Sequence, residues 1–244
     1  MMIYILMTIL LVLPIKIITG PGVIRPEVLV VVDRSLSQRI GDNDQEVKTY
    51  IRGFFCKVAR KFDSLSSPLV SLHLSDIVLS SPPYLASSVL NTSSSSVTSL
   101  YAAQALDMMG KHYYPPTVDL VITLLYLDLC NHGGDFCDIV GKTYTGGACL
   151  VDHRVKKAKG VALIEDDGDY SGVMVAVHEL AHLLGAVHDG YYGAAECSKE
   201  GFIMSERVRG DTWSQCSRNS IRQFITARAA SCLHNCPNNT QCAI

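Results

Sequence analysis

Three histidines lie close together in residues 178–189, which read His-Glu-Leu-Ala-His-Leu-Leu-Gly-Ala-Val-His-Asp. His178 and His182 are four residues apart, so on a helix their side chains lie on one face, about one turn from each other. Glu179 follows His178 directly, where its carboxylate can hydrogen-bond a water held by a cation without binding the cation itself. A site with three imidazoles and one open position is typical of catalytic zinc, because structural zinc sites use four protein ligands.

Gly185 and His188 complete the predicted zinc site. Glycine readily adopts the left-handed conformation that ends many helices. The chain can therefore turn at Gly185 and bring His188 to the cation as the third ligand. The alternative is a core helix with incidental histidines, which we disfavour because buried imidazoles without partners are costly. The sequence thus predicts three zinc ligands, with Glu179 as the general base.

The whole pattern from His178 to Asp189, HExxHxxGxxHD, resembles the metzincin metalloproteases, and the Asp after the third His resembles their adamalysin (reprolysin) branch. The resemblance implies a Met-turn below the zinc site, and Met204 in the segment 201–205 fits it. It also implies that Asp189 braces the Met-turn region by hydrogen bonds. The implied activity is zinc-dependent cleavage of protein and peptide substrates. The compact plan is more loosely similar to secreted arthropod metalloproteases of tick saliva and scorpion venom.

The two ends of the chain differ from its middle. Residues 1–20 are nearly all apolar and contain one charge, Lys16. Their unbroken apolar run is too short to cross about 30 Å of hydrocarbon, so a cleaved signal peptide is favoured over a membrane anchor. Residues 21–235 then form the adamalysin-like catalytic domain, and residues 236–244 a short cysteine-containing tail. We expect a secreted protein that leaves the membrane once the signal is removed.

Composition narrows the partners. The net charge of −2 gives no electrostatic reason to expect binding to nucleic acid. Nine cysteines indicate disulfides formed in an oxidising compartment. Acceptor sequons at Asn91 and Asn238 agree with export and predict a glycoprotein. We expect a monomer that meets its substrates outside the cell.

Strand and helix patterns alternate through the first two thirds of the chain, which is typical of an α/β fold. The apolar spacing predicts strands at 27–33, 69–79, 118–127 and 161–165, and helices at 45–62, 97–109, 170–184 and 221–230. The resemblance implies the metzincin zincin-like fold. That fold has a mixed twisted sheet with an antiparallel edge strand, a long zinc-binding helix and a small C-terminal subdomain.

The segment 141–149 is similar to the edge strand that forms the upper rim of the metzincin cleft. An unpaired sheet edge can bind an extended peptide as an additional strand. The alternative from local sequence is a glycine-rich turn. The residues predicted to form the substrate edge strand are Thr143, Tyr144, Thr145, Gly146 and Gly147.

The resemblance also implies disulfides Cys149–Cys232 and Cys197–Cys216. Cys130 and Cys137 bracket a loop that a local bridge would close. Three cysteines remain, namely Cys56, Cys236 and Cys242. For Cys56 two alternatives stay open, burial within its helix or a link to the tail.

A second metal site follows from the resemblance alone. Adamalysins hold calcium away from the cleft through residues near both ends of the domain. The matching residues are Glu27, Asp119, Cys232 and Asn235. Oxygen ligands from such distant segments suit Ca²⁺ and would tie the ends of the domain together.

One functional alternative comes from a different class. The chain could be a toxin or binding protein that uses a protease scaffold for a surface interaction. An intact set of three histidines together with Glu179 favours the enzyme, because a scaffold without catalytic demand could lose any of them.

Overall fold

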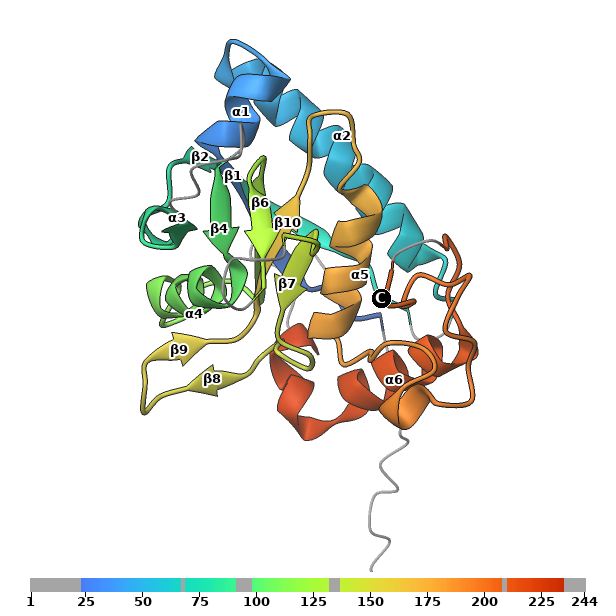
Figure 1. Ribbon diagram of the computed structural model, residues 1–244. Coiled ribbons are helices and arrows are strands. Elements are labelled where there is room, and N and C mark those ends of the chain that lie inside the picture. Colours follow the sequence, from blue (N-terminus) through green and yellow to red (C-terminus); the bar gives the residue numbers. More distant parts are fainter. Residues whose placement is uncertain (1–22, 67–68, 91–97, 132–136, 208–209, 235–244) are drawn as a thin grey trace, which may run out of the picture.

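The computed structural model describes residues 23–66, 69–90, 98–131, 137–207 and 210–234, which build a sheet with helices on both faces (Figure 1). The five strands of this main sheet run in the order β2-β1-β5-β10-β7. Their bounds are β1 (Glu27–Asp33), β2 (His73–Ser80), β5 (Leu120–Leu125), β7 (Gly141–Thr143) and β10 (Val161–Glu165). The first four strands in this order are parallel, and β7 pairs antiparallel with β10. The expected mixed sheet with an antiparallel edge strand is confirmed.

Helices cover both faces of this sheet (Figure 1). The helices are α1 (Arg34–Ile40), α2 (Asp44–Asp63), α3 (Pro83–Ala86), α4 (Ala102–His112), α5 (Val173–Leu183) and α6 (Gln215–Thr226), with 3-10 segments at Tyr192–Ala194 and Arg228–His234. Helices α2 and α5 share one hydrophobic core with the sheet, whereas α4 contributes to a second core. A small sheet contains β3 (Val89–Leu90), β4 (Ser99–Tyr101) and β6 (Asp128–Cys130), and β8 (Val151–Asp152) and β9 (Lys157–Ala158) form a separate hairpin.

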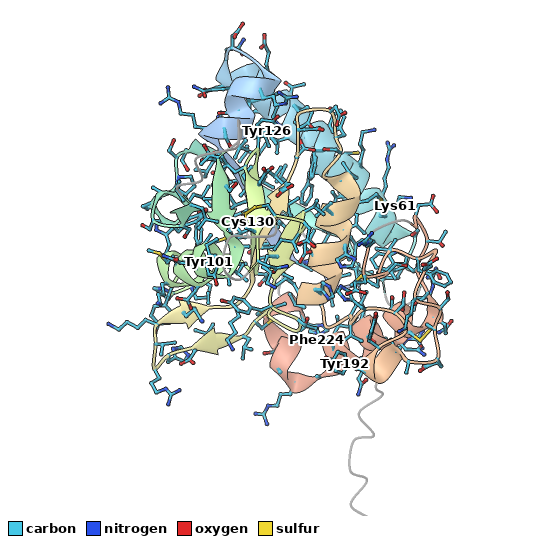
Figure 2. The ribbon with its side chains drawn as sticks, viewed as in Figure 1. Lys61, Tyr101, Tyr126, Cys130, Tyr192 and Phe224 are labelled. Atoms are coloured by element: carbon cyan, nitrogen blue, oxygen red, sulfur yellow. A yellow bond between two sulfur atoms is a disulfide. The ribbon has the colours of Figure 1, made fainter. Side chains whose placement is uncertain are left out.

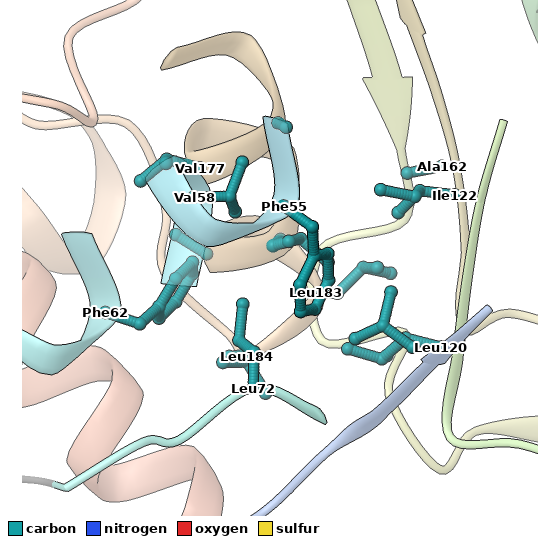
Figure 3. Packing of buried hydrophobic residues seen from close by; sticks show 14 of the residues in the cluster. Phe55, Val58, Phe62, Leu72, Leu120, Ile122, Ala162, Val177, Leu183 and Leu184 are labelled. Carbon is teal, nitrogen blue, oxygen red and sulfur yellow. The ribbon is translucent and has the colours of Figure 1, made fainter. Parts of the chain in front are cut away.

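Helix α2 packs against α5, the helix predicted to carry two zinc ligands. The Asn43 side chain caps α2 by accepting a hydrogen bond from the Glu46 amide at 3.0 Å. Val58 and Phe62 of α2 are fully buried in the same core as Val177 of α5 (Figure 3). Apolar residues at helical spacing give α2 one buried face. Because α5 packs against both α2 and β7, its orientation relative to the sheet edge is fixed.

Several predicted boundaries were wrong. The predicted helix 97–109 begins only at Ala102, because Ser99–Tyr101 forms β4 and pairs with β3 and β6. The predicted strand 69–79 begins at His73. The sequence interpretation omitted α1, whose short length gives only Leu36 as a buried residue. Tertiary pairing decides such short elements, and local apolar spacing carries little signal for them.

The last helix was also misplaced. We predicted 221–230, but α6 begins at Gln215, and Arg228–His234 is a separate 3-10 segment. The Ser214 hydroxyl caps α6 by accepting a hydrogen bond from the Ser217 amide at 3.0 Å. The first turns of α6 are mostly polar, so the apolar pattern began too late to reveal the true start.

Three disulfides join the cysteine pairs expected above: Cys149–Cys232, Cys197–Cys216 and Cys130–Cys137. Cys56 is exposed on α2, so of its two alternatives burial was wrong, and the tail cysteines of the other lie outside the described residues. Cys56 does not belong to the buried apolar face of α2.

Some expectations concern parts of the chain outside the described residues. These are the signal peptide 1–20, the tail 236–244, the two sequons and the calcium residue Asn235. Among the residues that the structure does describe, no helix is both long and apolar enough to cross a membrane.

Candidate active site

Helix α5 carries the first two predicted zinc ligands. It follows Gly172, whose amide donates to the Asp166 carboxylate at 2.8 Å. Most of its side chains are buried, because the helix lies between α2 and the sheet edge. His178 and His182 nevertheless lie on the side of α5 that lines a large cleft of about 1000 Å³. The expected helix 170–184 is thus slightly shorter in the structure, but it presents both imidazoles as predicted.

A glycine turn brings in the third histidine. Gly185 has φ +89°, the left-handed conformation expected for a helix end. Its amide donates to the His182 carbonyl at 2.9 Å, and the Ala186 amide donates to the Ala181 carbonyl at 3.0 Å. This pair of bonds is a Schellman motif, which satisfies the last carbonyls of α5. The chain then reverses and places His188 beside the two helical histidines.

The three imidazoles converge through their Nε2 atoms. His188 Nε2 lies 3.1 Å from both His178 Nε2 and His182 Nε2. Tetrahedral zinc with bonds of about 2.0–2.1 Å requires nitrogens about 3.3 Å apart, so the spacing fits this ion. Within the described part of the chain, one ligand atom from each histidine lies within 4.8 Å of the other two.

Backbone carbonyls fix how two of these rings are protonated. His178 Nδ1 lies 2.7 Å from the Ile203 carbonyl, and His182 Nδ1 lies 2.7 Å from the Ala186 carbonyl. A carbonyl only accepts, so each Nδ1 carries the proton and each Nε2 presents a lone pair. Lone pairs facing one another at this distance repel unless a cation lies between them. The three Nε2 atoms therefore fit Zn²⁺, and the Ile203 and Ala186 carbonyls orient the rings of His178 and His182.

Burial keeps the imidazoles neutral. It lowers the pKa of His178 to about 4 and that of His182 to about 3, and the neighbouring rings add to this effect. Burial also lowers the pKa of His188, although the charges of Glu206 and Asp189 oppose the shift. Neutral imidazole is the form that binds metal.

Glu179 lies in the cleft beside the histidine cluster and is only 7% exposed. Burial raises its pKa to about 8, and the positive charge of Lys142 opposes the rise. Gly141 of β7 faces this carboxylate closely, because a Cβ at that position would lie 2.7 Å from Glu179 Oε1. A carboxylate with a pKa near neutrality is suited to accept and return a proton.

The segment 201–205 lies under the histidines as a tight turn. Met204 is fully buried, and its carbonyl accepts from the Asp189 amide at 2.9 Å. Asp189 Oδ1 in turn accepts from the Ser214 hydroxyl at 2.6 Å, which links the turn to the start of α6. The same turn supplies the Ile203 carbonyl that orients His178. Sequence reasoning identified Met204 and Asp189 but missed Ile203 and Ser214, since backbone carbonyls and caps from distant segments carry no motif.

The edge-strand prediction was correct only in part. β7 is Gly141–Thr143, so Thr143 is its last residue and Thr145 and Gly146 lie in a turn. Thr143 and Thr145 line the cleft, but Tyr144 packs against the second core. The Gly146 amide donates to the His182 carbonyl at 2.8 Å, which anchors the turn to the end of α5.

Gly147 continues this turn. Its amide donates to the Tyr144 carbonyl at 2.9 Å. A Cβ there would lie 2.3 Å from the Lys159 carbonyl, so the close packing requires glycine. The glycine-rich turn considered from local sequence therefore describes Thr145, Gly146 and Gly147 better than a strand does.

Three of the four predicted calcium residues lie together elsewhere. Glu27, Asp119 and Cys232 line one pocket of about 270 Å³, which we call the Asp119 pocket. The Glu27 amide donates to Asp119 Oδ2 at 2.9 Å. Burial raises the pKa of Asp119 to about 6, and this hydrogen bond opposes the rise. The predicted grouping is therefore present for the described residues.

The fold and the histidine site define a zinc metalloprotease of the metzincin class. In agreement, the archaemetzincin of Methanopyrus kandleri has a similar fold, with a TM-score of 0.54 and 12% identity over 83% of this chain and 97% of the archaeal one. At that identity, the likeness speaks for the fold alone.

Comparisons of sequence identify the branch. Residues 132–237 match the model of the reprolysin (M12B) family of zinc metalloproteases. A disintegrin and metalloproteinase with thrombospondin motifs like protein of Bombyx mori is 35% identical over 90% of this chain and 34% of its own length. Venom metalloproteinase 3 of Eulophus pennicornis is 26% identical over 85% of this chain and 51% of its own length. The chain thus spans about a third to a half of these relatives, and it is a metzincin of the adamalysin (reprolysin) type.

Proposed function

We propose that this protein is a secreted zinc endopeptidase that hydrolyses peptide bonds of extracellular proteins. The observation that carries the proposal is the convergence of three neutral Nε2 lone pairs beside a buried carboxylate on the floor of a large cleft. His178, His182 and His188 hold the metal, and Glu179 is the general base.

The chain's own residues prepare the reaction. Zn²⁺ held by these histidines would polarise the scissile carbonyl and lower the pKa of a water molecule, which would supply a hydroxide-like nucleophile near neutral pH. Glu179 accepts the proton of the attacking water and later donates it to the leaving amine. Gly141 leaves the room that the Glu179 carboxylate needs, and the Ile203 and Ala186 carbonyls keep the histidine rings in place.

The edge of the sheet positions the substrate. β7 pairs with β10 on one side, and its other side faces the cleft as the last strand of the sheet. An extended peptide can add to this edge through backbone hydrogen bonds, with the scissile bond near the histidines. Backbone pairing gives affinity for many sequences, so selectivity must come from side chains in the cleft.

Calcium binding is a second part of the proposal. The Glu27 and Asp119 carboxylates and the Cys232 carbonyl would supply oxygen ligands in the Asp119 pocket, together with Asn235. Support comes from the grouping of three of these residues and from the partly buried carboxylate of Asp119, which a cation would stabilise.

Export is supported by the covalent structure. Three disulfides are typical of proteins that fold in an oxidising compartment. One of them, Cys149–Cys232, joins the segment after the cleft edge to the last described turn.

The decisive experiment is the substitution Glu179→Gln. Zinc content should be unchanged because glutamine at this position touches no ligand atom. The rate of casein cleavage should fall by about 10²–10⁴-fold, the range for loss of a general base. The matched control is Glu200→Gln, an exposed carboxylate outside the cleft. Full activity of the Glu179 variant would refute the assignment, and zinc-loaded wild type without any cleavage would favour the binding-protein alternative.

A further inference from the structure

Lys142 is a half-buried lysine in the active-site cleft. It is the central residue of β7 and lines the cleft together with Glu179. Among the described residues, no carboxylate lies within salt-bridge distance of its ammonium group. A partly desolvated ammonium with three donors gains from any anion that can reach it.

The position of Lys142 places its charge beside the reaction centre. Its neighbour Gly141 abuts the Glu179 carboxylate, so β7 runs directly along the catalytic group. The positive charge of Lys142 lowers the pKa of both Glu179 and His182. A peptide aligned on β7 must therefore pass this ammonium within a few residues of its scissile bond.

Other charges of the cleft are placed differently. Asp138, Glu206 and Arg207 also line it, but all three side chains are exposed. The Glu206 carboxylate accepts a hydrogen bond from the Tyr191 hydroxyl at 3.0 Å. Exposed charges are screened by solvent and salt, so Lys142 has the strongest potential to select a substrate side chain.

We propose that Lys142, held on the edge strand β7 beside Glu179, selects substrates with an acidic side chain close to the scissile bond. The inference rests on the proposed peptidase function and names its substrate class. Lys142 and Glu179 line the same cleft, and an extended peptide advances about 3.3 Å per residue. We therefore expect the acidic residue within about three positions of the cleaved bond. The carboxylate forms a charge-assisted hydrogen bond with the ammonium and replaces the water that Lys142 loses when the peptide binds.

The test uses peptides of one sequence in which Glu, Gln or Lys is placed in turn at each of the three positions on either side of the cleaved bond. For zinc-loaded wild type, kcat/KM at one position should be about five- to tenfold higher with Glu than with Gln, as expected for a half-buried ion pair. Lys142→Met should abolish this ratio, and Lys142→Glu should reverse it in favour of the Lys peptide. Raising the salt concentration should weaken the wild-type preference.

The control variant is Lys156→Met, which removes the same charge from an exposed position in the β8–β9 hairpin outside the cleft. It should keep the wild-type ratio. A wild type without acidic preference, or a Lys142→Met variant that keeps it or slows all peptides equally, would overturn the inference. Peptide affinity is measured in parallel on Glu179→Gln. Two results together would separate the inference from the peptidase function: Glu peptides bind more tightly in a way that depends on Lys142, and wild type cleaves no peptide. The inference would then hold for binding, and the peptidase function would be rejected.

Discussion

The predicted zinc site and the Asp119 pocket, which we propose for calcium, are of opposite construction. The zinc ligands lie within eleven consecutive residues, and one helix followed by one glycine turn brings them together. The Asp119 pocket instead joins the start of β1, the start of β5 and the C-terminal 3-10 segment. Local chain geometry builds the first site, whereas the second exists only when the whole domain has folded.

This difference has an energetic consequence. A ligand that binds only the folded state stabilises it, and the effect is largest where the site is absent from the unfolded chain. The predicted zinc ligands are close in sequence, so they can still bind zinc together in the unfolded chain. Such binding reduces the stability that zinc adds to the folded state. We therefore expect zinc to control activity and calcium to control mainly the stability of the domain ends.

The largest expected effect is on the zinc site. His182→Ala removes a ligand and should lower zinc affinity by more than the about 10–100-fold that loss of an orienting partner causes. Peptidase activity should disappear with the metal. Bound zinc is measured by atomic absorption after dialysis, with Asp119→Asn as the matched control that keeps its zinc. Equal zinc content in both variants would remove the distinction between the two sites.

The second effect concerns the Asp119 pocket. Calcium added to chelator-treated protein should raise the melting temperature, with a stabilisation of about 2.7 kcal/mol at a hundredfold excess over Kd. Asp119→Asn should abolish this rise because the anionic ligand is lost. Calorimetry with and without Ca²⁺ measures it at constant zinc. If wild type melts at the same temperature in both conditions, the calcium assignment is wrong.

A smaller effect tests the turn that completes the zinc site. Gly185→Ala should cost about 1–2 kcal/mol for the left-handed backbone, because φ is +89°. Further loss comes from Phe224 of α6, which is labelled in Figure 2. Its Cβ would lie 2.7 Å from the added methyl. Gly193→Ala is the control, since nothing lies within 4 Å of its added Cβ. Denaturant unfolding compares the two variants, and equal stability would contradict the proposed strain.

The smallest expected effect is a pH dependence of stability that involves no metal ligand. Burial raises the pKa of Glu165 to about 7, although its Oε1 accepts a hydrogen bond from the Leu129 amide at 2.5 Å. The folded protein thus holds a proton that the unfolded chain releases near pH 4.5, so this group lowers stability as the pH rises from about 4.5 to about 7.

Glu165→Gln removes the titrating group, so the free energy of unfolding should fall less between pH 5 and pH 8. Each kcal/mol of stability regained at pH 8 should raise the melting temperature there by about 2–4 °C. Melting curves at pH 5 and pH 8 provide the measurement. Glu196→Gln, at an exposed site, serves as the control. A variant that declines with pH as steeply as wild type would show that Glu165 does not titrate in this range.

The sequence predicted elements best where one pattern was long. The strands at Glu27–Asp33 and Val161–Glu165 agree with the structure residue for residue, because each consists mainly of buried apolar side chains. It failed at β4 and α1, which contain three and seven residues. Short elements form because neighbours pair with them, and a local pattern does not record those neighbours.

By itself, the sequence determined the metal and the class of chemistry. The identity and spacing of His178, Glu179, His182 and His188 specify a helix, a turn and a three-imidazole site, since all of these depend on interactions within a few residues. Tertiary structure alone decided that the Ile203 carbonyl orients His178, that Gly141 makes room for the Glu179 carboxylate, and that Lys142 lines the same cleft. Those contacts join segments more than 20 residues apart, so only the packed sheet, helix and turn could bring them together.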